Sequence, residues 1–261
     1  MEPSASTSGS ETSLSMISGA FYIAKEGGKN PQGDDAHFIS KEKQTIGVAD
    51  GVGGWSSKGV DAGEYARKLV SNFVNELENS PTVKKNHKID LKRTLMKAYS
   101  NTNVEGSSTI CVLTLENKTI HAVNVGDSGF MVIRDGAQVY KSSIQTYRFN
   151  FPYQLGKTSS DPSVAKVCTV PVQAGDIVIV GTDGLFDNLF TSDITNLVNI
   201  LGGAGAEPEH VARTIAEYAY YNSIDKIMST PFAVASLENG RPCSGGKRDD
   251  ITVVVSFIVS N

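Results

Sequence analysis

The chain has few of the residues that mark several common classes of protein. Its three cysteines, Cys111, Cys168 and Cys243, are widely spaced and form no CxxC pair, which excludes a disulfide framework and a cysteine zinc site. Its four histidines show no HExxH or paired spacing, so a histidine-rich zinc site is also disfavoured. The formal net charge of −4 gives no overall basic character and so disfavours nucleic-acid binding. Such sparse cysteine usage fits a reducing, intracellular compartment.

Long apolar runs are missing as well. No run approaches the roughly 20 residues that a membrane-spanning helix needs, and the chain does not start with a charged segment followed by an apolar one. The first 18 residues are acidic and contain no arginine, unlike an intact mitochondrial transit peptide. We therefore expect a soluble intracellular protein without a membrane span. It would be cytoplasmic, or located in a chloroplast or mitochondrion if a transit peptide is absent from this chain.

What the chain does contain is enough apolar material for one large domain. Of its 261 residues 39% are hydrophobic and 20% are charged. Residues 1–18 are dominated by Ser, Thr, Gly and Glu and predict a flexible tail, because such a segment buries too little surface to order itself. Residues 19–261 are predicted to form a single domain, and we expect a monomer.

Strand-like and helical patterns alternate irregularly along that domain. Apolar residues recur at helical spacing from Ala62 to Leu77 and again from Leu91 to Tyr99, and two more helices are predicted over Ser192–Leu201 and Pro208–Lys226. Between the two pairs of helices, short β-branched segments from Ser108 to Tyr140 predict a β-meander. The pattern favours antiparallel sheets with helices packed outside them.

Acidic pairs mark the ends of several strands. Asp50-Gly51 and Asp183-Gly184 directly follow short apolar runs, and Asp249-Asp250 directly precedes another. If the last strand is antiparallel to the first two, these acids share one edge of a sheet. Carboxylates gathered without basic partners repel one another, and a hard cation such as Mg²⁺ or Mn²⁺ is the usual remedy. The same reasoning places Asp127, Asp34 and Asp35 at that edge.

Each pair also has a simpler explanation, because Asp-Gly is one of the commonest turn sequences. Asp135-Gly136 lies between two strand-like segments and is interpreted as a hairpin turn only. The segment Cys243–Arg248 superficially resembles a cysteine phosphatase loop. Its spacing is one residue too short and it precedes a strand, so a cysteine nucleophile is rejected.

Six motifs taken in order carry more information than any one of them. Together they closely resemble the metal-dependent protein phosphatase 2C family, also called PPM, and in particular its plant and mitochondrial or organelle-associated branch. The motifs are Gly33-Asp-Asp-Ala-His37, Val48-Ala-Asp-Gly-Val-Gly-Gly-Trp55, Gly106-Ser-Ser-Thr109, Asn124-Val-Gly-Asp-Ser128, Thr182-Asp-Gly-Leu-Phe-Asp187 and Asp249-Asp-Ile-Thr252.

This resemblance implies an α+β fold, an αββα four-layer sandwich with two central antiparallel sheets flanked by helices. It implies a protein serine/threonine phosphatase with two Mg²⁺ or Mn²⁺ ions, in which a metal-bridging water attacks phosphoserine or phosphothreonine without a covalent phosphoenzyme. Asp50 would bridge both ions, the Gly51 carbonyl would bind one, and Asp183 and Asp249 would bind the other. Asp35 would act through bound water.

The resemblance also implies that Asp127 matches an acid that, with Asp183, holds a third ion in some relatives, and that Asp34 lies behind the ligands. Phosphorylated proteins would be the partners, and the segment from Tyr147 to Leu155 would influence which of them docks.

Two departures from the family pattern leave questions open. Many relatives carry a phosphate-binding arginine before the first acidic pair, where this chain has Lys29-Asn-Pro-Gln-Gly33, so Lys29, Lys247 and Arg248 are candidates for that role. Many also have histidine after the second Asp-Gly, where this chain has Val52. Two alternatives therefore stay open: a catalytically silent scaffold that binds a phosphoprotein, and an unrelated carboxylate-metal hydrolase acting on nucleic acid.

Overall fold

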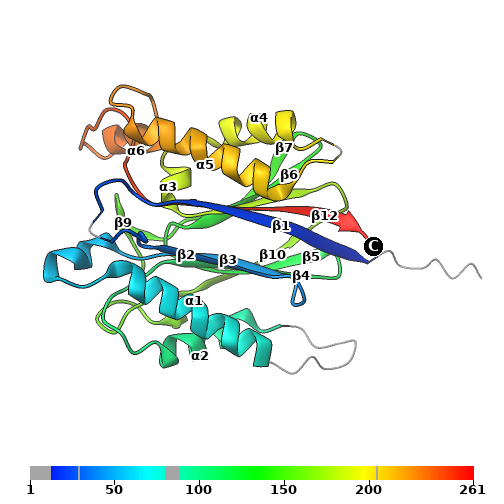
Figure 1. Cartoon of the computed structure of the whole chain (residues 1–261), viewed down its shortest axis with the longest axis horizontal. Helices are drawn as coiled ribbons and strands as arrows, with labels where there is room; N and C mark the ends of the chain where they lie inside the picture. Colours follow the sequence, from blue (N-terminus) through cyan, green and yellow to red (C-terminus); the bar gives the residue numbers. More distant parts are fainter. Residues whose placement is uncertain (1–12, 29, 80–88, 204) are drawn as a thin grey trace, which may run out of the picture.

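Two five-stranded antiparallel sheets lie face to face between two layers of helices (Figure 1). The computed structural model describes residues 13–28, 30–79, 89–203 and 205–261. Helices α1 and α2 cover one sheet, and helices α4 and α5 cover the other (Figure 1). The predicted αββα four-layer sandwich is confirmed.

Each sheet combines strands from distant parts of the chain. The first contains, in spatial order, β1 (Leu14–Ile23), β12 (Ile251–Ser260), β11 (Ile177–Gly181), β6 (Gly129–Arg134) and β7 (Ala137–Lys141). The second contains β10 (Lys166–Pro171), β5 (Thr119–Val125), β4 (Ile110–Glu116), β3 (Thr45–Asp50) and β2 (Asp35–Ser40). A separate hairpin pairs β8 (Thr146–Arg148) with β9 (Phe151–Pro152).

Helices connect the strands and cover the outer faces of the sheets. They are α1 (Ala62–Asn79), α2 (Leu91–Asn101), α3 (Asp183–Phe186), α4 (Thr191–Leu201), α5 (Pro208–Ile224) and α6 (Pro231–Glu238), with short 3-10 turns at Gly53–Lys58 and Pro162–Val164. The four helices predicted from apolar periodicity thus appear as α1, α2, α4 and α5. Among the described residues, none of the helices has both the length and the apolar character needed to cross a membrane.

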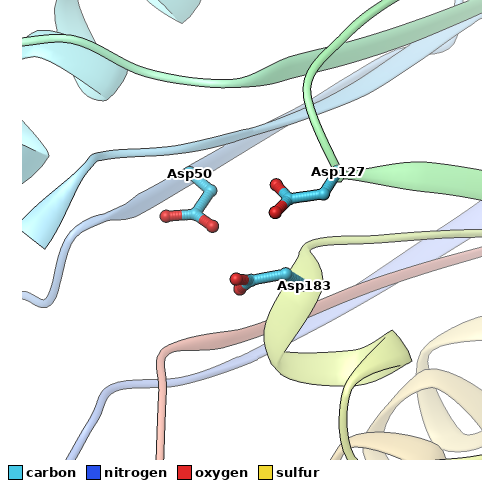
Figure 2. Close-up of side chains that lie close together, drawn as sticks. All are labelled: Asp50, Asp127 and Asp183. Atoms are coloured by element: carbon cyan, nitrogen blue, oxygen red, sulfur yellow. The ribbon is translucent and has the colours of Figure 1, made fainter. Parts of the chain in front are cut away.

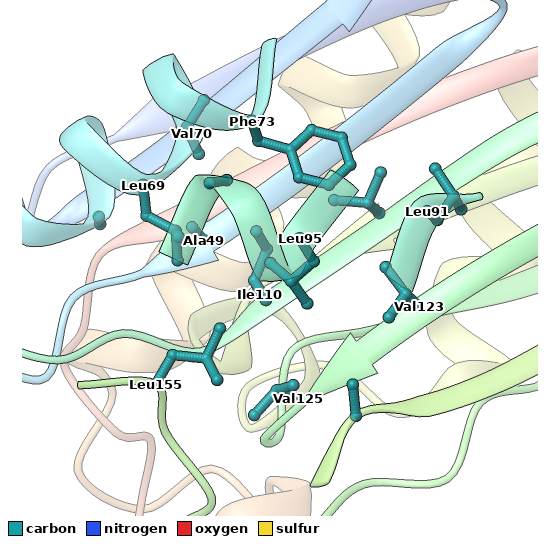
Figure 3. Packing of buried hydrophobic residues seen from close by; sticks show 14 of the residues in the cluster. Ala49, Leu69, Val70, Phe73, Leu91, Leu95, Ile110, Val123, Val125 and Leu155 are labelled. Carbon is teal, nitrogen blue, oxygen red and sulfur yellow. The ribbon is translucent and has the colours of Figure 1, made fainter. Parts of the chain in front are cut away.

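The core consists of three apolar layers, one between the sheets and one under each pair of helices. Neighbouring residues on a strand supply different layers: Val254 packs between the sheets, whereas Val253 and Val255 pack under α4 and α5. Figure 3 shows the layer in which Leu69 and Phe73 of α1 face the second sheet. Strands buried on both faces are apolar throughout, which explains why these segments read as continuous runs.

The N-terminal boundary differs from the prediction. The predicted flexible tail of residues 1–18 overlaps β1, in which Leu14 to Ser18 pair with Ser260 to Ser256 of β12. Met16 is buried between the sheets, so a short apolar alternation inside a polar segment was enough to form a strand. Residues 1–12 lie outside the described part of the chain.

The predicted β-meander is also wrong in one respect. β4 pairs with β5 and β6 pairs with β7, but β5 and β6 belong to different sheets. The chain crosses between the sheets at Gly126, whose φ of 101° is a left-handed conformation that favours glycine. Helix α6 was not predicted.

Candidate metal centre

Three of the acids predicted to share an edge lie close together at one end of the sandwich. Asp50 ends β3, Asp127 lies in the turn between β5 and β6, and Asp183 begins α3 directly after β11. One carboxylate oxygen from each of the three lies within 4.8 Å of the others. In Figure 2 the three side chains point toward one another from separate elements. The prediction of a single sheet edge was too simple, because β3 and β5 belong to one sheet and β11 to the other.

Asp35 sits beside this group and is buried. It is the first residue of β2 and pairs in register with Asp50. The hydroxyls of Thr182 and Thr252 donate hydrogen bonds to its Oδ2 atom at 2.8 and 2.7 Å. Its Oδ1 atom has no hydrogen-bond partner among the described residues, so one oxygen is fixed and the other is available.

The acidic pair before β12 divides between two environments. The Asp249 carboxylate lies 3.5 Å from Lys25 Nζ and 3.2 Å from Lys247 Nζ. Asp250 is buried and instead accepts hydrogen bonds from the Tyr22 hydroxyl and, at 3.2 Å, from the Lys25 main-chain N–H. Asp249 therefore faces the acid cluster, and Asp250 anchors the segment that leads into β2.

Lys247 places a cation among the acids. Its ammonium binds Asp183 closely, and lies 2.8 Å from Asp187 and 3.2 Å from Asp249. The main chain of Lys247 is fixed by the buried Asn188 side chain, which accepts from the Lys247 N–H at 2.9 Å and donates to its carbonyl at 2.8 Å. The position of this ammonium group is thus set by the backbone as well as by charge.

Burial and neighbouring charges shift the pKa values of the clustered carboxyl groups in different directions. Burial, reinforced by neighbouring carboxylates, raises the pKa of Asp50 well above its usual range and that of Asp127 to about 8. Burial also acts on Asp183, but there the Lys247 ammonium more than compensates and holds the pKa below its ordinary value. Asp187 has a pKa raised to about 6 by burial, an effect that Lys247 opposes.

The donor set fits a hard cation. Asp35, Asp127 and Asp183 each have one buried Oδ1 atom without a hydrogen-bond partner among the described residues. Buried carboxylate oxygens without donors are costly, and hard cations prefer oxygen ligands. Gly51 is buried beside them, and a side chain there would meet the Ala62 carbonyl oxygen at 2.4 Å. The role of the Gly51 carbonyl as an ion ligand stays a prediction.

The predicted phosphate-binding residues have different surroundings. Lys29 lies outside the described residues. Lys247 is engaged by three carboxylates, and Arg248 is exposed. Sequence analysis missed Lys25 and gave no role to Asp187. For Asp187 a signal existed, because it follows Asp183 by four residues and so lies one helical turn away.

Comparison with known proteins identifies the same family that the six sequence motifs resemble. The protein phosphatase 2C family model matches residues 26–215. "Probable protein phosphatase 2C 55" of Arabidopsis thaliana is 46% identical over 250 residues, and "Probable protein phosphatase 2C 80" of the same plant is 44% identical over 257. These matches cover 95% and 98% of this chain, which spans 53% and 61% of the lengths of the two relatives.

Solved structures resemble the chain over nearly its whole length. The photosystem II phosphatase PBCP is 30% identical with a TM-score of 0.85, and the match covers 93% of this chain and 98% of that one. The catalytic domain of the phosphatase PstP shares the fold at 17% identity, with a TM-score of 0.65 over 94% of this chain and 99% of its own. The chain belongs to the protein phosphatase 2C family.

Proposed function

We propose that this chain is a metal-dependent protein serine/threonine phosphatase. The observation that carries the proposal is the meeting of Asp50, Asp127 and Asp183 within 4.8 Å, where Asp127 and Asp183 each have a buried Oδ1 atom without a hydrogen-bond partner among the described residues. Family membership supports the reaction class. The PstP structure, which has the same fold, is described as a complex with two manganese ions, and this supports Mg²⁺ or Mn²⁺ as the cofactor.

Each acid has a place in the proposed site. Asp50 lies centrally and would bridge two ions, with the Gly51 carbonyl on one, and Asp183 and Asp249 on the other. Asp35 would hold water through its available Oδ1 atom, since its Oδ2 atom is taken by two threonine hydroxyls. Asp127 is close enough to Asp50 and Asp183 to contribute to a third ion.

The chemistry follows from positive charge held at a buried acidic site. When bound, two divalent ions would supply a water nucleophile at neutral pH and neutralise the phosphate oxygens during in-line displacement. Asp50, Asp183 and Asp249 would hold the ions from three separate places in the chain. A water nucleophile of this kind requires no covalent phosphoenzyme, so we propose direct hydrolysis.

Phosphopeptide hydrolysis tests this function. We expect release of phosphate from phosphoserine and phosphothreonine peptides with Mn²⁺ or Mg²⁺, and none with EDTA. The Asp183→Asn variant should be inactive under the same conditions, whereas Asp135→Asn, in the hairpin turn between β6 and β7, should match the parent chain. Metal-independent turnover would contradict the mechanism. Metal binding without any turnover would instead favour a phosphoprotein-binding scaffold.

Partners and location are proposed more broadly. We propose phosphorylated proteins as substrates, a monomeric state, and an intracellular location, either cytoplasmic or in a chloroplast or mitochondrion. The similarity to a photosystem II phosphatase supports the chloroplast among these compartments. Cell fractionation and size-exclusion chromatography test the two assignments.

A further inference from the structure

A cavity of about 460 Å³ opens beside the acid cluster. Three acids line its inner end, namely Asp127, Asp183 and Asp187. Much of its wall comes from two segments far apart in sequence, β8 with the turn that follows it (residues 146–150) in the flap of β8 and β9, and helix α6. The cavity is therefore continuous with the place where a phosphoryl group would be held.

Aromatic side chains form much of the wall, and we call the space the aromatic cavity. Phe149 of the flap packs against Phe232 of α6, with ring centroids 5.3 Å apart. Phe186 of α3 also lines it, and all three rings are only partly buried. Partly buried aromatic rings around an open volume are characteristic of ligand pockets.

Phe232 connects the aromatic cavity to the acid cluster. Its main-chain N–H donates to the Asp187 carbonyl at 3.0 Å, which ties the start of α6 to the end of α3. Its ring lies 5.7 Å from the Lys247 ammonium. The wall is thus anchored to the elements that carry the acids, and distances between the two regions are fixed.

Two cations complete the lining. Lys141 and Arg148 line the cavity, and neither forms a salt bridge with a carboxylate among the described residues. Their charged groups lie over aromatic rings, with Lys141 Nζ 5.2 Å from the Phe186 centroid and the Arg148 guanidinium 4.5 Å from the Phe151 centroid. With two cations and three acids in the lining, charge gives the aromatic cavity no single preference, and the aromatic wall is what would select a ligand.

We propose that the aromatic cavity binds one large apolar side chain of the substrate, within about three residues of the phosphorylated serine or threonine. The inference rests on the proposed function, because it takes the acid cluster as the position of the phosphoryl group. It names the substrate class more narrowly: phosphopeptides with an aromatic or long aliphatic residue next to the phosphorylated one are preferred.

Binding of a peptide series tests the inference without any variant. The probes are fluorescent peptides that carry a non-hydrolysable phosphonate analogue of phosphoserine in an Ala/Gly background, with a single Phe moved through the neighbouring positions. Affinity is measured by fluorescence anisotropy with Mn²⁺ present. Burying one phenyl ring should tighten binding about tenfold at one or two positions relative to the all-Ala peptide. Affinities within about twofold of one another at every position would overturn the inference.

Variants assign the effect to the aromatic cavity. In Phe149→Ala and in Phe232→Ala the preference for the Phe peptide should disappear. Phe151→Ala is the matched control, because Phe151 belongs to the same flap and is outside the lining, and it should keep the preference. A preference that persists in both cavity variants would overturn the inference.

Hydrolysis of the matching phosphoserine peptides reports the proposed function separately. Tight binding of the Phe peptide without any phosphate release would support the aromatic cavity and contradict the phosphatase activity. Phosphate release at equal rates and equal affinities for all peptides would do the reverse.

Discussion

The two halves of the acid cluster differ in how their charge is balanced. Around Asp183, Asp187 and Asp249 the buried Lys247 ammonium lies within 3.2 Å of the Asp187 and Asp249 carboxylates and binds Asp183 closely. Asp50 and Asp127 have no such cation, and neither forms a salt bridge within the described ranges. Neighbouring aspartates of one cluster therefore differ in whether a lysine ammonium balances their charge.

This difference predicts that the two halves affect the stability of the metal-free protein in different ways. In the half around Asp183, Asp187 and Asp249 the chain itself supplies one ammonium, which offsets part of the repulsion among the three carboxylates before a divalent ion arrives. The other half stays unfavourable until its carboxylates bind a proton or a metal ion. Changes on the two sides should consequently have opposite effects on the metal-free protein.

The largest effect is expected from Asp50→Asn. Phosphopeptide hydrolysis with Mn²⁺ should fall by at least about a hundredfold, because a central ligand is lost. In EDTA the same variant should be more stable than the parent chain, since a buried, uncompensated carboxylate has been removed. Steady-state kinetics and urea unfolding measure the two effects. If the variant were less stable than the parent chain in EDTA, the Asp50 carboxylate would have to be stabilised by its surroundings, which would contradict the comparison.

The opposite sign is expected for Lys247→Met. Without the lysine, three buried carboxylates lose their counter-ion, and the free energy of unfolding in EDTA should fall by about 3 kcal/mol. With Mn²⁺ present the loss should be smaller, because the ion neutralises the same acids. Lys97→Met is the control: Lys97 pairs with Glu76 on the surface at 3.1 Å, and its loss should cost less than about 1 kcal/mol. Equal losses in the two variants would contradict the special role of Lys247.

The pH dependence of the metal-free chain should follow the unbalanced half. Because the pKa of Asp127 is raised to about 8 by burial and by Asp183, the folded state holds its proton where the unfolded state has released it. Asp127 therefore stabilises the fold at pH values below its ordinary pKa, and this contribution is lost as pH rises toward about 8. Urea unfolding in EDTA across that range measures the slope. Asp127→Asn should flatten it, and an unchanged slope would assign the effect to other acids.

The smallest effect is expected from Lys25→Met. Lys25 approaches Asp249 at 3.5 Å, but its side chain is 41% exposed, so water and salt screen the pair. The free energy of unfolding in EDTA should change by less than about 1 kcal/mol, and the change should shrink further at high salt. A loss as large as that of Lys247→Met would mean that both lysines, rather than the buried one, neutralise this half.

Sequence reasoning could predict where the acids lie along the chain because strand ends are marked locally by the change from apolar to acidic residues. Asp183 follows β11 and Asp249 precedes β12, and these two strands pair antiparallel as expected. The division into two sheets was not predictable in the same way. It depends on where the chain passes from one sheet to the other, and the crossing at Gly126 between β5 and β6 resembles any other glycine turn in the sequence.

Lys247 shows the other limit of sequence reasoning. It lies in a glycine-rich segment without periodicity, and its partners Asp183 and Asp187 are more than fifty residues away in the chain. Only the folded chain brings them together. Helix α6, by contrast, had a recognisable start: Thr230 accepts a hydrogen bond from the Ala233 N–H and Pro231 follows it, a common beginning for a helix.

The pairing of β1 with β12 has a consequence for synthesis of the chain. Among the described strands, the only partner of β1 is β12, which follows every other strand in sequence and itself lies between β1 and β11. A ribosome therefore releases the first strand long before the strand that must sit beside it. The first sheet cannot close until β12 has emerged, so we expect nascent chains to expose an apolar sheet edge until then, a state that favours aggregation.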